Sequence, residues 1–253
     1  MLQPGSYVIA STMSVPEIVG MLSSPGGNEA IVTIPEGATL KDIDALLTKA
    51  GVIDEGALAR FRFEDLAQEY QFLRGENSLE GFLFPDTYRF EVGASLDSIA
   101  AKMLKNFEMK AWPILEGRRD WYEDLILASY LEREVPLYED RTIVAGILLK
   151  RIKMGMLLQV DATLSYAKCN GKLLGCPTIK IGRNDLGMAS PYNTYKRSGW
   201  TPTPIANPGL EAIKAAVQFK KTPYLYYFSA RESGKTIFSK TLEEHNQNKA
   251  KYL

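Results

Sequence analysis

The chain has 253 residues, and its thirty basic and thirty acidic residues cancel at neutral pH. This balance gives no electrostatic reason to expect binding to nucleic acid or to an anionic membrane surface. One histidine and two cysteines are too few for a structural zinc site, which takes four nitrogen or sulfur ligands. No apolar stretch approaches the roughly 20 residues that span a bilayer, and the composition is that of a globular protein.

The first half of the chain contains a weak internal repeat of a short strand, a turn and a helix. The copies are "VIASTMSVPEIVGMLSS", "TIPEGATLKDIDALLTK" and, more loosely, "YRFEVGASLDSIAAKML". In each copy a serine or threonine precedes the helix. In the first two copies an acidic residue follows three places later, which is the pattern of a capping box. Units this small cannot each bury an apolar face, so we expect them to pack together.

The segment between the second and third copies, "SLEGFLFPDTYRF", is rich in aromatic side chains. This composition favours either a packed corner of a sheet or a wall that contacts a ligand, and the sequence leaves both open.

From about residue 121 the pattern becomes mainly helical, and together with the first half it predicts an α+β fold. The expected elements are a helix over 122–135 that stops at Pro136, a helix over 138–154 that stops at Gly155, a further element beginning in 157–167, an irregular segment over 189–209, a short helix in 207–219, a hairpin over 224–239 and a C-terminal helix over 240–253. Cys169 and Cys176 flank an Asn-Gly turn, a spacing that permits either a local disulfide or two free thiols.

Several chemistries are excluded by the residues present. The sequence has no glycine-rich phosphate loop, no nucleophile elbow around a serine and no cluster of metal ligands. His245 lies in a polar helix, where we expect it to be solvated or to cap the helix. Carboxylate chemistry remains, without a cofactor or metal.

Two glutamates end the apolar helix "LILASYLEREVP", and a helical wheel at about 100° per residue separates them. Glu132 falls beside Ser129 on the polar side. Glu134 falls next to Leu127 and Leu131 at the edge of the apolar arc. A carboxyl group there is poorly solvated when charged, so its pKa should rise into the range of a general acid. A glutamate in the last turn of a helix is more often simply solvated, so position alone does not decide its role.

Five motifs, "EGFLFPDTY", "LASYLERE", "LQVDATLSYA", "PYNTY…G…PTPIANPG" and "PYLYYFSA…FSKTLEEHN", occur in the order and spacing of the endolytic murein transglycosylases of the MltG/YceG-like family. The resemblance covers essentially the whole chain. It implies a LysM-like region over residues 1–78 packed on a mixed α+β catalytic domain over 79–253. It also implies a location on the outer face of the bacterial cytoplasmic membrane, with a single-pass N-terminal anchor that is absent from this sequence.

The activity implied by the resemblance is that of a lyase in cell wall biogenesis. Family members cleave the MurNAc-β-1,4-GlcNAc bond of peptidoglycan and leave 1,6-anhydroMurNAc ends, with one glutamate as acid and then base. The family's catalytic glutamate falls on Glu134, where Arg133 replaces a lysine and Val135 replaces a threonine. The expected substrate-binding residues are Gln159, Asp161, Tyr192, Asn193, Tyr195, Glu80 and Phe84. The expected partners are peptidoglycan glycan strands and peptidoglycan synthases.

Three other functions remain open at this point. The chain could be a non-catalytic peptidoglycan-binding module, or a scaffold that only recruits synthases. It could also be a hydrolase in which Asp161, Asp86 or Glu80 is a second carboxylate that supports attack by water.

Overall fold

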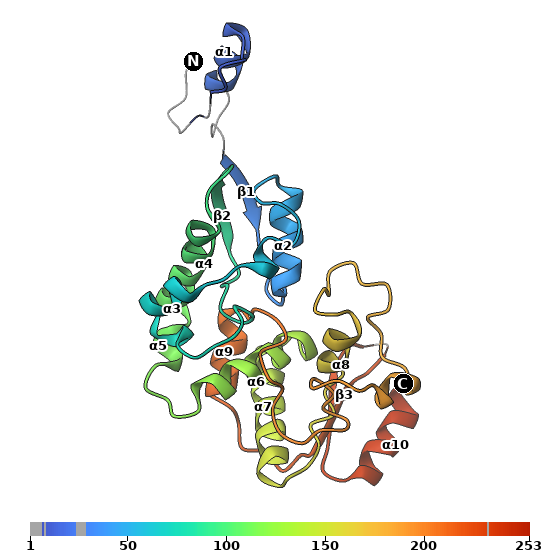
Figure 1. The fold of residues 1–253 in the computed structure, drawn as a ribbon. Coiled ribbons are helices and arrows are strands. Elements are labelled where there is room, and N and C mark those ends of the chain that lie inside the picture. Colours follow the sequence, from blue (N-terminus) through green and yellow to red (C-terminus); the bar gives the residue numbers. More distant parts are fainter. Residues whose placement is uncertain (1–6, 8, 24–28, 232) are drawn as a thin grey trace.

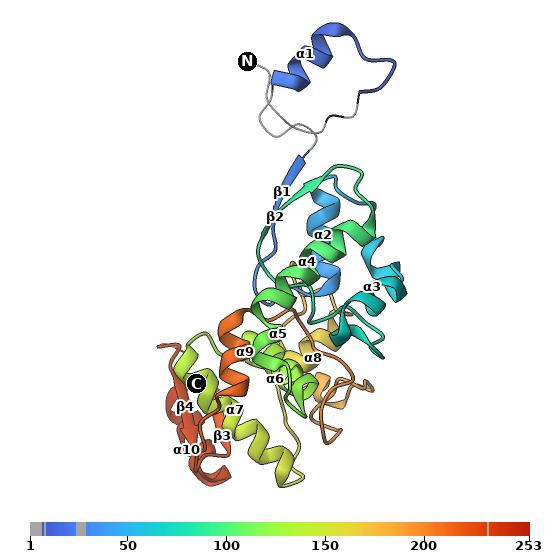
Figure 2. The ribbon, with the colours of Figure 1, turned by 90° about the vertical axis from the view of Figure 1, so that its left-hand side faces the viewer.

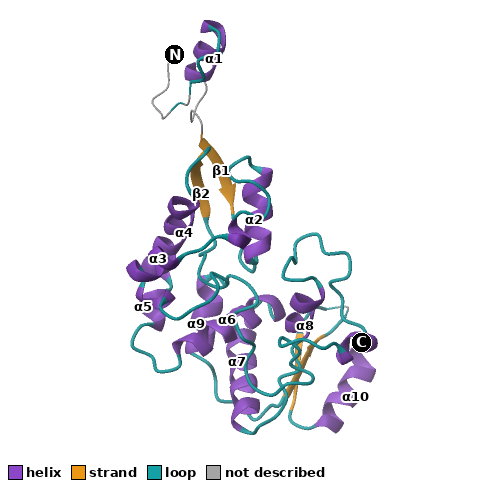
Figure 3. Cartoon of the chain, in the orientation of Figure 1, coloured by secondary structure: helices purple, strands orange, loops and turns teal. Residues whose placement is uncertain are grey.

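The computed structural model describes residues 7, 9–23, 29–231 and 233–253, and it confirms the α+β class (Figures 1 and 3). The α-helices are α1 (Val15–Ser23), α2 (Leu40–Lys49), α3 (Glu64–Glu69), α4 (Leu96–Lys110), α5 (Trp112–Leu115), α6 (Trp121–Glu134), α7 (Tyr138–Lys153), α8 (Asp161–Lys168), α9 (Leu210–Val217) and α10 (Leu242–Tyr252). The strands are β1 (Glu29–Thr33), β2 (Thr87–Glu91), β3 (Tyr226–Ser229) and β4 (Thr236–Ser239), and the 3₁₀ helices are η1 (Leu58–Arg60), η2 (Gln71–Leu73) and η3 (Arg183–Gly187).

The second and third copies of the repeat pack together as expected. Their strands, β1 and β2, pair antiparallel, with Thr33 opposite Thr87. Thr39 begins α2 with a complete capping box, because its side chain accepts from the Asp42 N–H while the Asp42 carboxylate accepts from the Thr39 N–H. Ser95 caps α4 in the same position.

The first copy of the repeat does not join this packing. Its helix, α1, has no buried residue and stands apart from the rest of the molecule in both views (Figures 1 and 2). The strand expected for this copy falls partly outside the described residues. Among the described helices, none combines the length and apolarity needed to cross a membrane.

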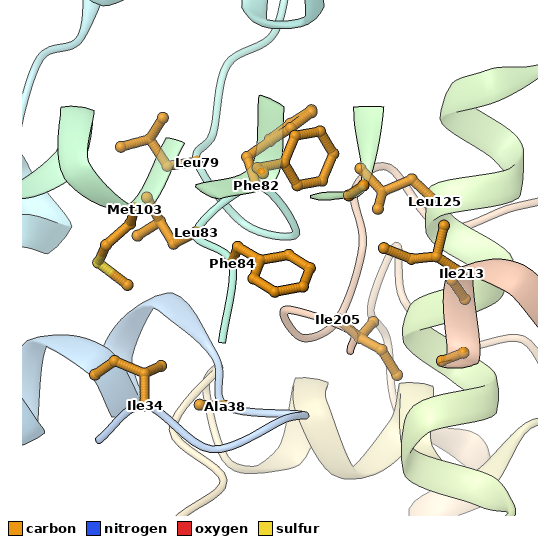
Figure 4. Close-up of a cluster of buried hydrophobic side chains, with 14 of the residues drawn as sticks. Ile34, Ala38, Leu79, Phe82, Leu83, Phe84, Met103, Leu125, Ile205 and Ile213 are labelled. Atoms are coloured by element: carbon orange, nitrogen blue, oxygen red, sulfur yellow. The ribbon is translucent and has the colours of Figure 1, made fainter. Parts of the chain in front are cut away.

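The aromatic segment over 78–90 is a packed corner and not a ligand wall. Phe82 and Leu83 are fully buried. Figure 4 shows the neighbouring Phe84 ring with the N-terminal residues Ile34 and Ala38 on one side and Leu125, Ile205 and Ile213 on the other. One continuous apolar core therefore joins β1 and α2 to α6 and α9.

A polar contact reinforces the same junction. The fully buried Asn207 donates from its amide to the Ala38 carbonyl at 2.9 Å, and its amide oxygen accepts from the N–H groups of Gly81 and Leu83 at 2.9 Å each. The bond to Ala38 and the pairing of β1 with β2 both cross the expected boundary between residues 78 and 79. The division into two domains at that boundary stays a prediction.

Helices α6, α7 and α9 pack on one another below this junction and carry the hairpin β3–β4 and α10 beside them (Figure 1). Gly146 in α7 permits one close approach, because a Cβ atom there would lie 2.0 Å from the Lys220 carbonyl oxygen. After α8, Cys169 and Cys176 form a disulfide, so the alternative of two free thiols does not hold. The enclosed loop is tied to α2, since the Leu174 N–H donates to the Asp42 carboxylate at 2.8 Å.

Candidate active site

A pocket of ≈ 640 Å³ lies where the end of α6, the loop before α8, strand β3 and helix α10 meet. Glu134, the last residue of α6, lines it. Gln159 reaches the same pocket from the loop before α8, Asp161 reaches it as the first residue of α8, and Tyr195 reaches it from the irregular segment. Four of the side chains expected from the sequence are therefore gathered at one place.

Two fixed hydrogen bonds orient the Glu134 carboxyl group. One oxygen accepts from the Ala162 N–H at 3.0 Å, and the other accepts from the Tyr227 hydroxyl at 3.1 Å. The N-cap residue of α8 is Val160, whose side chain cannot accept a hydrogen bond. Glu134 therefore satisfies one of the N–H groups that this helix start leaves unpaired, at the end where the helix dipole favours a negative charge.

The surroundings bring the two charge states of Glu134 close in free energy. Burial raises its pKa to about 7, and the nearby charge of Asp161 acts in the same direction. The hydrogen bonds from Ala162 and Tyr227 oppose this rise, because they stabilise the carboxylate. At neutral pH this group can therefore give up a proton and also take one back, which agrees with the rise in pKa expected from the helical wheel.

The loop before α8 is held to the irregular segment by several bonds. Gln159 has a φ of 53°, a left-handed conformation that few residues other than glycine adopt. Its N–H donates to the Thr194 carbonyl at 3.1 Å, and the Val160 N–H donates to the Thr194 hydroxyl at 3.0 Å. Tyr195 then donates its hydroxyl to the Asp161 carboxylate. These contacts fix Gln159, Asp161 and Tyr195 beside Glu134, with Gln159 and Asp161 exposed.

Tyr192 and Asn193 lie outside the lining of this pocket. The Tyr192 hydroxyl shares a hydrogen bond of 2.9 Å with that of Thr203. Asn193 is fully buried, and its amide donates to the carbonyls of Leu186 and Met188. Asn193 thus holds the irregular segment in shape and is not available to a ligand in this structure.

Glu80 and Phe84 are also buried away from the pocket, contrary to the substrate contacts expected of them. Glu80 accepts from the Leu40 N–H at 2.9 Å and from the Tyr166 hydroxyl at 3.0 Å, and burial raises its pKa to about 8. Phe84 is 6% exposed and packs under the Lys110 ammonium group. The sequence pattern identified this aromatic segment as unusual, but it did not show that its side chains point into the core.

The three residues around Glu134 in the sequence have different surroundings. Glu132 forms an ion pair with Arg141 at 2.7 Å, with both side chains 6% exposed, and accepts from the Gly209 N–H at 2.9 Å. The polar side of α6 on which the wheel places Glu132 is therefore covered in the fold, because α7 supplies a cation there. Arg133 lines the pocket. Val135 is buried in the core, so no hydroxyl stands at the position of the family's threonine.

Two pocket residues had no sequence signal of their own. Tyr227 is one of two adjacent tyrosines in β3, and only the three-dimensional structure shows that it bonds Glu134. Arg151 in α7 is 5% exposed and donates to the carbonyls of Leu225 and Leu158 at 2.8 and 2.7 Å. His245, expected to be solvated or to cap the helix, is 9% exposed because α10 packs its ring against Tyr226 and Phe228 of the hairpin.

The fold and the pocket together define an α+β protein whose site holds one carboxyl group suited to acid–base chemistry. The chain belongs to the YceG-like family, whose model matches residues 1–251. It is 34% identical over 270 residues to the endolytic murein transglycosylase of Bacillus subtilis (strain 168), a match that covers 99% of this chain and 73% of that protein. The family resemblance predicted from the motifs is confirmed.

Two further matches agree with this assignment. The endolytic murein transglycosylase of Streptococcus pneumoniae (strain ATCC BAA-255 / R6) is 29% identical over 284 residues, and the chain spans about half of it, 51%. The crystal structure of the yceG-like protein lmo1499 from Listeria monocytogenes superposes with a TM-score of 0.75 at 30% identity, covering 98% of this chain and 85% of that one. The chain is therefore a member of an enzyme family whose curated relatives are lytic transglycosylases.

Proposed function

We propose that this chain is an endolytic murein transglycosylase that cleaves the MurNAc-β-1,4-GlcNAc bond within glycan strands, with Glu134 as acid and then base. One observation carries the proposal. The Glu134 carboxyl group lies in an open pocket between a helix N–H group and the Tyr227 hydroxyl, and its pKa is raised to about 7. The names of the curated relatives support the substrate.

In the first step, protonated Glu134 gives its proton to the glycosidic oxygen. The bond between C1 of MurNAc and that oxygen breaks with its electron pair on the oxygen, which becomes the 4-hydroxyl of GlcNAc. Positive charge develops at C1 and the ring oxygen. The Ala162 N–H and the Tyr227 hydroxyl stabilise the carboxylate that remains, and the negative charge of Asp161 beside it favours the developing cation.

In the second step, the Glu134 carboxylate takes the proton of the MurNAc 6-hydroxyl as that oxygen bonds to C1. The product is a 1,6-anhydroMurNAc end, and no water is consumed. The nucleophile already belongs to the sugar, so its effective concentration is high and no water has to be positioned. One carboxyl group is then sufficient, with Gln159, Asp161 and Tyr195 as the sugar contacts that the pocket offers.

A murein hydrolase is the second candidate function, because Asp161 lines the same pocket and is a second carboxylate beside Glu134. The other two carboxylates considered for this role are less suitable. Asp86 binds Lys110 and Asn106 far from the pocket lining, and Glu80 is buried at the junction with α2.

Mass spectrometry of glycan strands digested in ¹⁸O-labelled water tests the proposal. We expect anhydro ends that are one water lighter than hydrolysed ends, no label at the new ends, and cleavage inside the strands. Labelled MurNAc ends would show a hydrolase and direct attention to Asp161. Binding of strands without any cleavage would show a non-catalytic module. The relatives' cell wall substrate also leads us to propose an extracytoplasmic location and, as further partners, peptidoglycan synthases.

A further inference from the structure

One wall of the pocket is a single face of α10. Leu242, His245, Asn246 and Lys249 all line the pocket, and steps of three, one and three residues place them on the same side of the helix. A helix face that packs into a core is apolar at such positions. Here three of the four side chains are polar, and Asn246 and Lys249 are exposed. This face is therefore suited to bind a polar group.

A buried cation lies in the same part of the pocket. Arg151 is held by hydrogen bonds to the carbonyls of Leu157, Leu158 and Leu225, and its guanidinium lies 5.2 Å from the Tyr226 ring centroid. Within the part of the chain that the structure describes, no carboxylate forms an ion pair with it. Buried charges are normally paired because removing them from water is costly. An anion that enters the pocket would supply the missing charge.

The part of the pocket beside α10 carries positive charge. The negative charge of Asp161 helps to raise the pKa of Glu134 at the other side of the pocket. Arg151 and Lys249 both act on His245, whose pKa is lowered by burial first and then by these two cations. Two cations thus act at His245, on the side of the pocket that α10 lines.

In a murein strand that bears peptides, the lactyl carboxyl group of MurNAc is tied up in an amide, so the sugars themselves are neutral and this positive region has no counterpart in the glycan backbone. The peptides attached to the lactyl group of MurNAc carry free carboxylates. We infer that Arg151, His245, Asn246 and Lys249 form a subsite, here called the α10 subsite, that binds a carboxylate of the peptide next to the cleaved bond. This inference rests on the proposed function and adds that the enzyme prefers peptide-bearing strands to peptide-free strands.

Lys249 provides the sharpest test because it is exposed, and Lys251 on the same helix is a matched control that does not line this pocket. The variants are Lys249→Glu, the milder Lys249→Gln, and Lys251→Glu. Each is given peptide-bearing strands and strands whose peptides an amidase has removed. The second substrate keeps a free lactyl carboxylate directly on MurNAc, so the comparison asks whether the pocket binds a carboxylate at the distance of the peptide. The readout is the ratio of kcat/KM for the two substrates, from counts of anhydro ends. Thermal melting checks that all variants fold.

We expect the wild type to prefer peptide-bearing strands and Lys249→Glu to reduce this preference about tenfold, mainly through KM. Lys249→Gln should have a smaller effect, Lys251→Glu should keep the wild-type ratio, and added salt should weaken the preference. A wild type without preference, or equal effects at Lys249 and Lys251, would overturn the inference. If no strand is cleaved, the proposed function fails. The ratio of the Kd values for peptide-bearing and peptide-free strands, measured on the same variants, then tests the α10 subsite by itself.

Discussion

The two glutamates at the end of α6 are two residues apart in the sequence but belong to different regions of the molecule. Glu132 faces α7 and α9. The Arg141 guanidinium forms an ion pair with it, and the Gly209 N–H donates a hydrogen bond to it. Glu134 faces the pocket, where its hydrogen-bond partners are an uncharged N–H group and a hydroxyl. The charge that acts on it there is the negative charge of Asp161, which raises its pKa.

Under the proposed function, this difference in partners, and not burial alone, separates the acid from its neighbour. A buried carboxyl group with a cationic partner is held as a carboxylate and serves the fold. A carboxyl group with only neutral donors keeps two accessible charge states and serves proton transfer. Each of the following predictions tests one side of this comparison.

The largest expected effect is the loss of activity in Glu134→Gln. The amide cannot give a proton to the glycosidic oxygen, so the rate of anhydro-end formation should fall by about 10²–10⁴-fold. The amide has nearly the shape of the carboxyl group, so the melting temperature should change little. Cleavage of glycan strands followed by mass spectrometry measures the rate, and retention of more than a tenth of wild-type activity would contradict the role of Glu134.

The matched substitution Glu132→Gln should affect stability instead. It leaves the buried Arg141 without its ion-pair partner, and breaking a buried ion pair in this way costs about 3–5 kcal/mol. Urea unfolding measures the loss of free energy. The activity of the fraction that remains folded should stay close to that of the wild type. A stable but inactive Glu132→Gln would reverse the assignment of the two glutamates.

The same contrast applies to Asn193 and Tyr195. Asn193→Ala should lower the free energy of unfolding by about 2–3 kcal/mol, because two partly buried carbonyl groups lose the donor that the fully buried Asn193 amide supplies. Tyr195→Phe removes only a hydroxyl at the pocket, so it should weaken turnover with a smaller change in stability. Thermal melting and cleavage assays on both variants separate the two effects, and equal losses of stability would place Tyr195 in the scaffold as well.

The smallest expected effect is a change in pH dependence. The acid works only when protonated, so kcat/KM should fall as the pH rises through about 7, the pKa of Glu134. Tyr227→Phe removes a hydrogen bond that lowers this pKa, so the alkaline limb should move up by about one pH unit, or 1.4 kcal/mol. Tyr224→Phe, at a ring that stacks on Phe238 outside this pocket, is the control. An unchanged limb in Tyr227→Phe would show that this hydroxyl does not act on the acid.

Much of the fold was predictable because its signals are local. Each of these signals determines the conformation of residues only a few positions away. They are the apolar periodicity of the helices, the caps at Thr39 and Ser95, and the helix stops at Pro136 and Gly155. The pairing of β1 with β2 was harder to predict from the sequence. More than fifty residues separate the two strands, and the repeat does not indicate which residues lie opposite each other.

The site was only partly predictable for the same reason. The wheel placed Glu134 at an apolar edge, which depends on its own helix alone. The surroundings of Glu132 and Asn193 depend on α7 and on the fold of the irregular segment, which no periodic pattern encodes. Tyr227 could have been selected only by knowing that β3 passes the end of α6.

The hydrogen bonds of Asn207 also have a consequence for how this chain can be recombined. Its amide lies in the C-terminal half, yet it holds backbone groups of Ala38, Gly81 and Leu83 together. A chimera that exchanges only the N-terminal 78 residues between relatives would inherit this amide from one parent and part of its contacts from the other. The loop around residue 207 has to be exchanged together with the N-terminal part. The segments to exchange are therefore chosen by their contacts in space and not by their position along the chain.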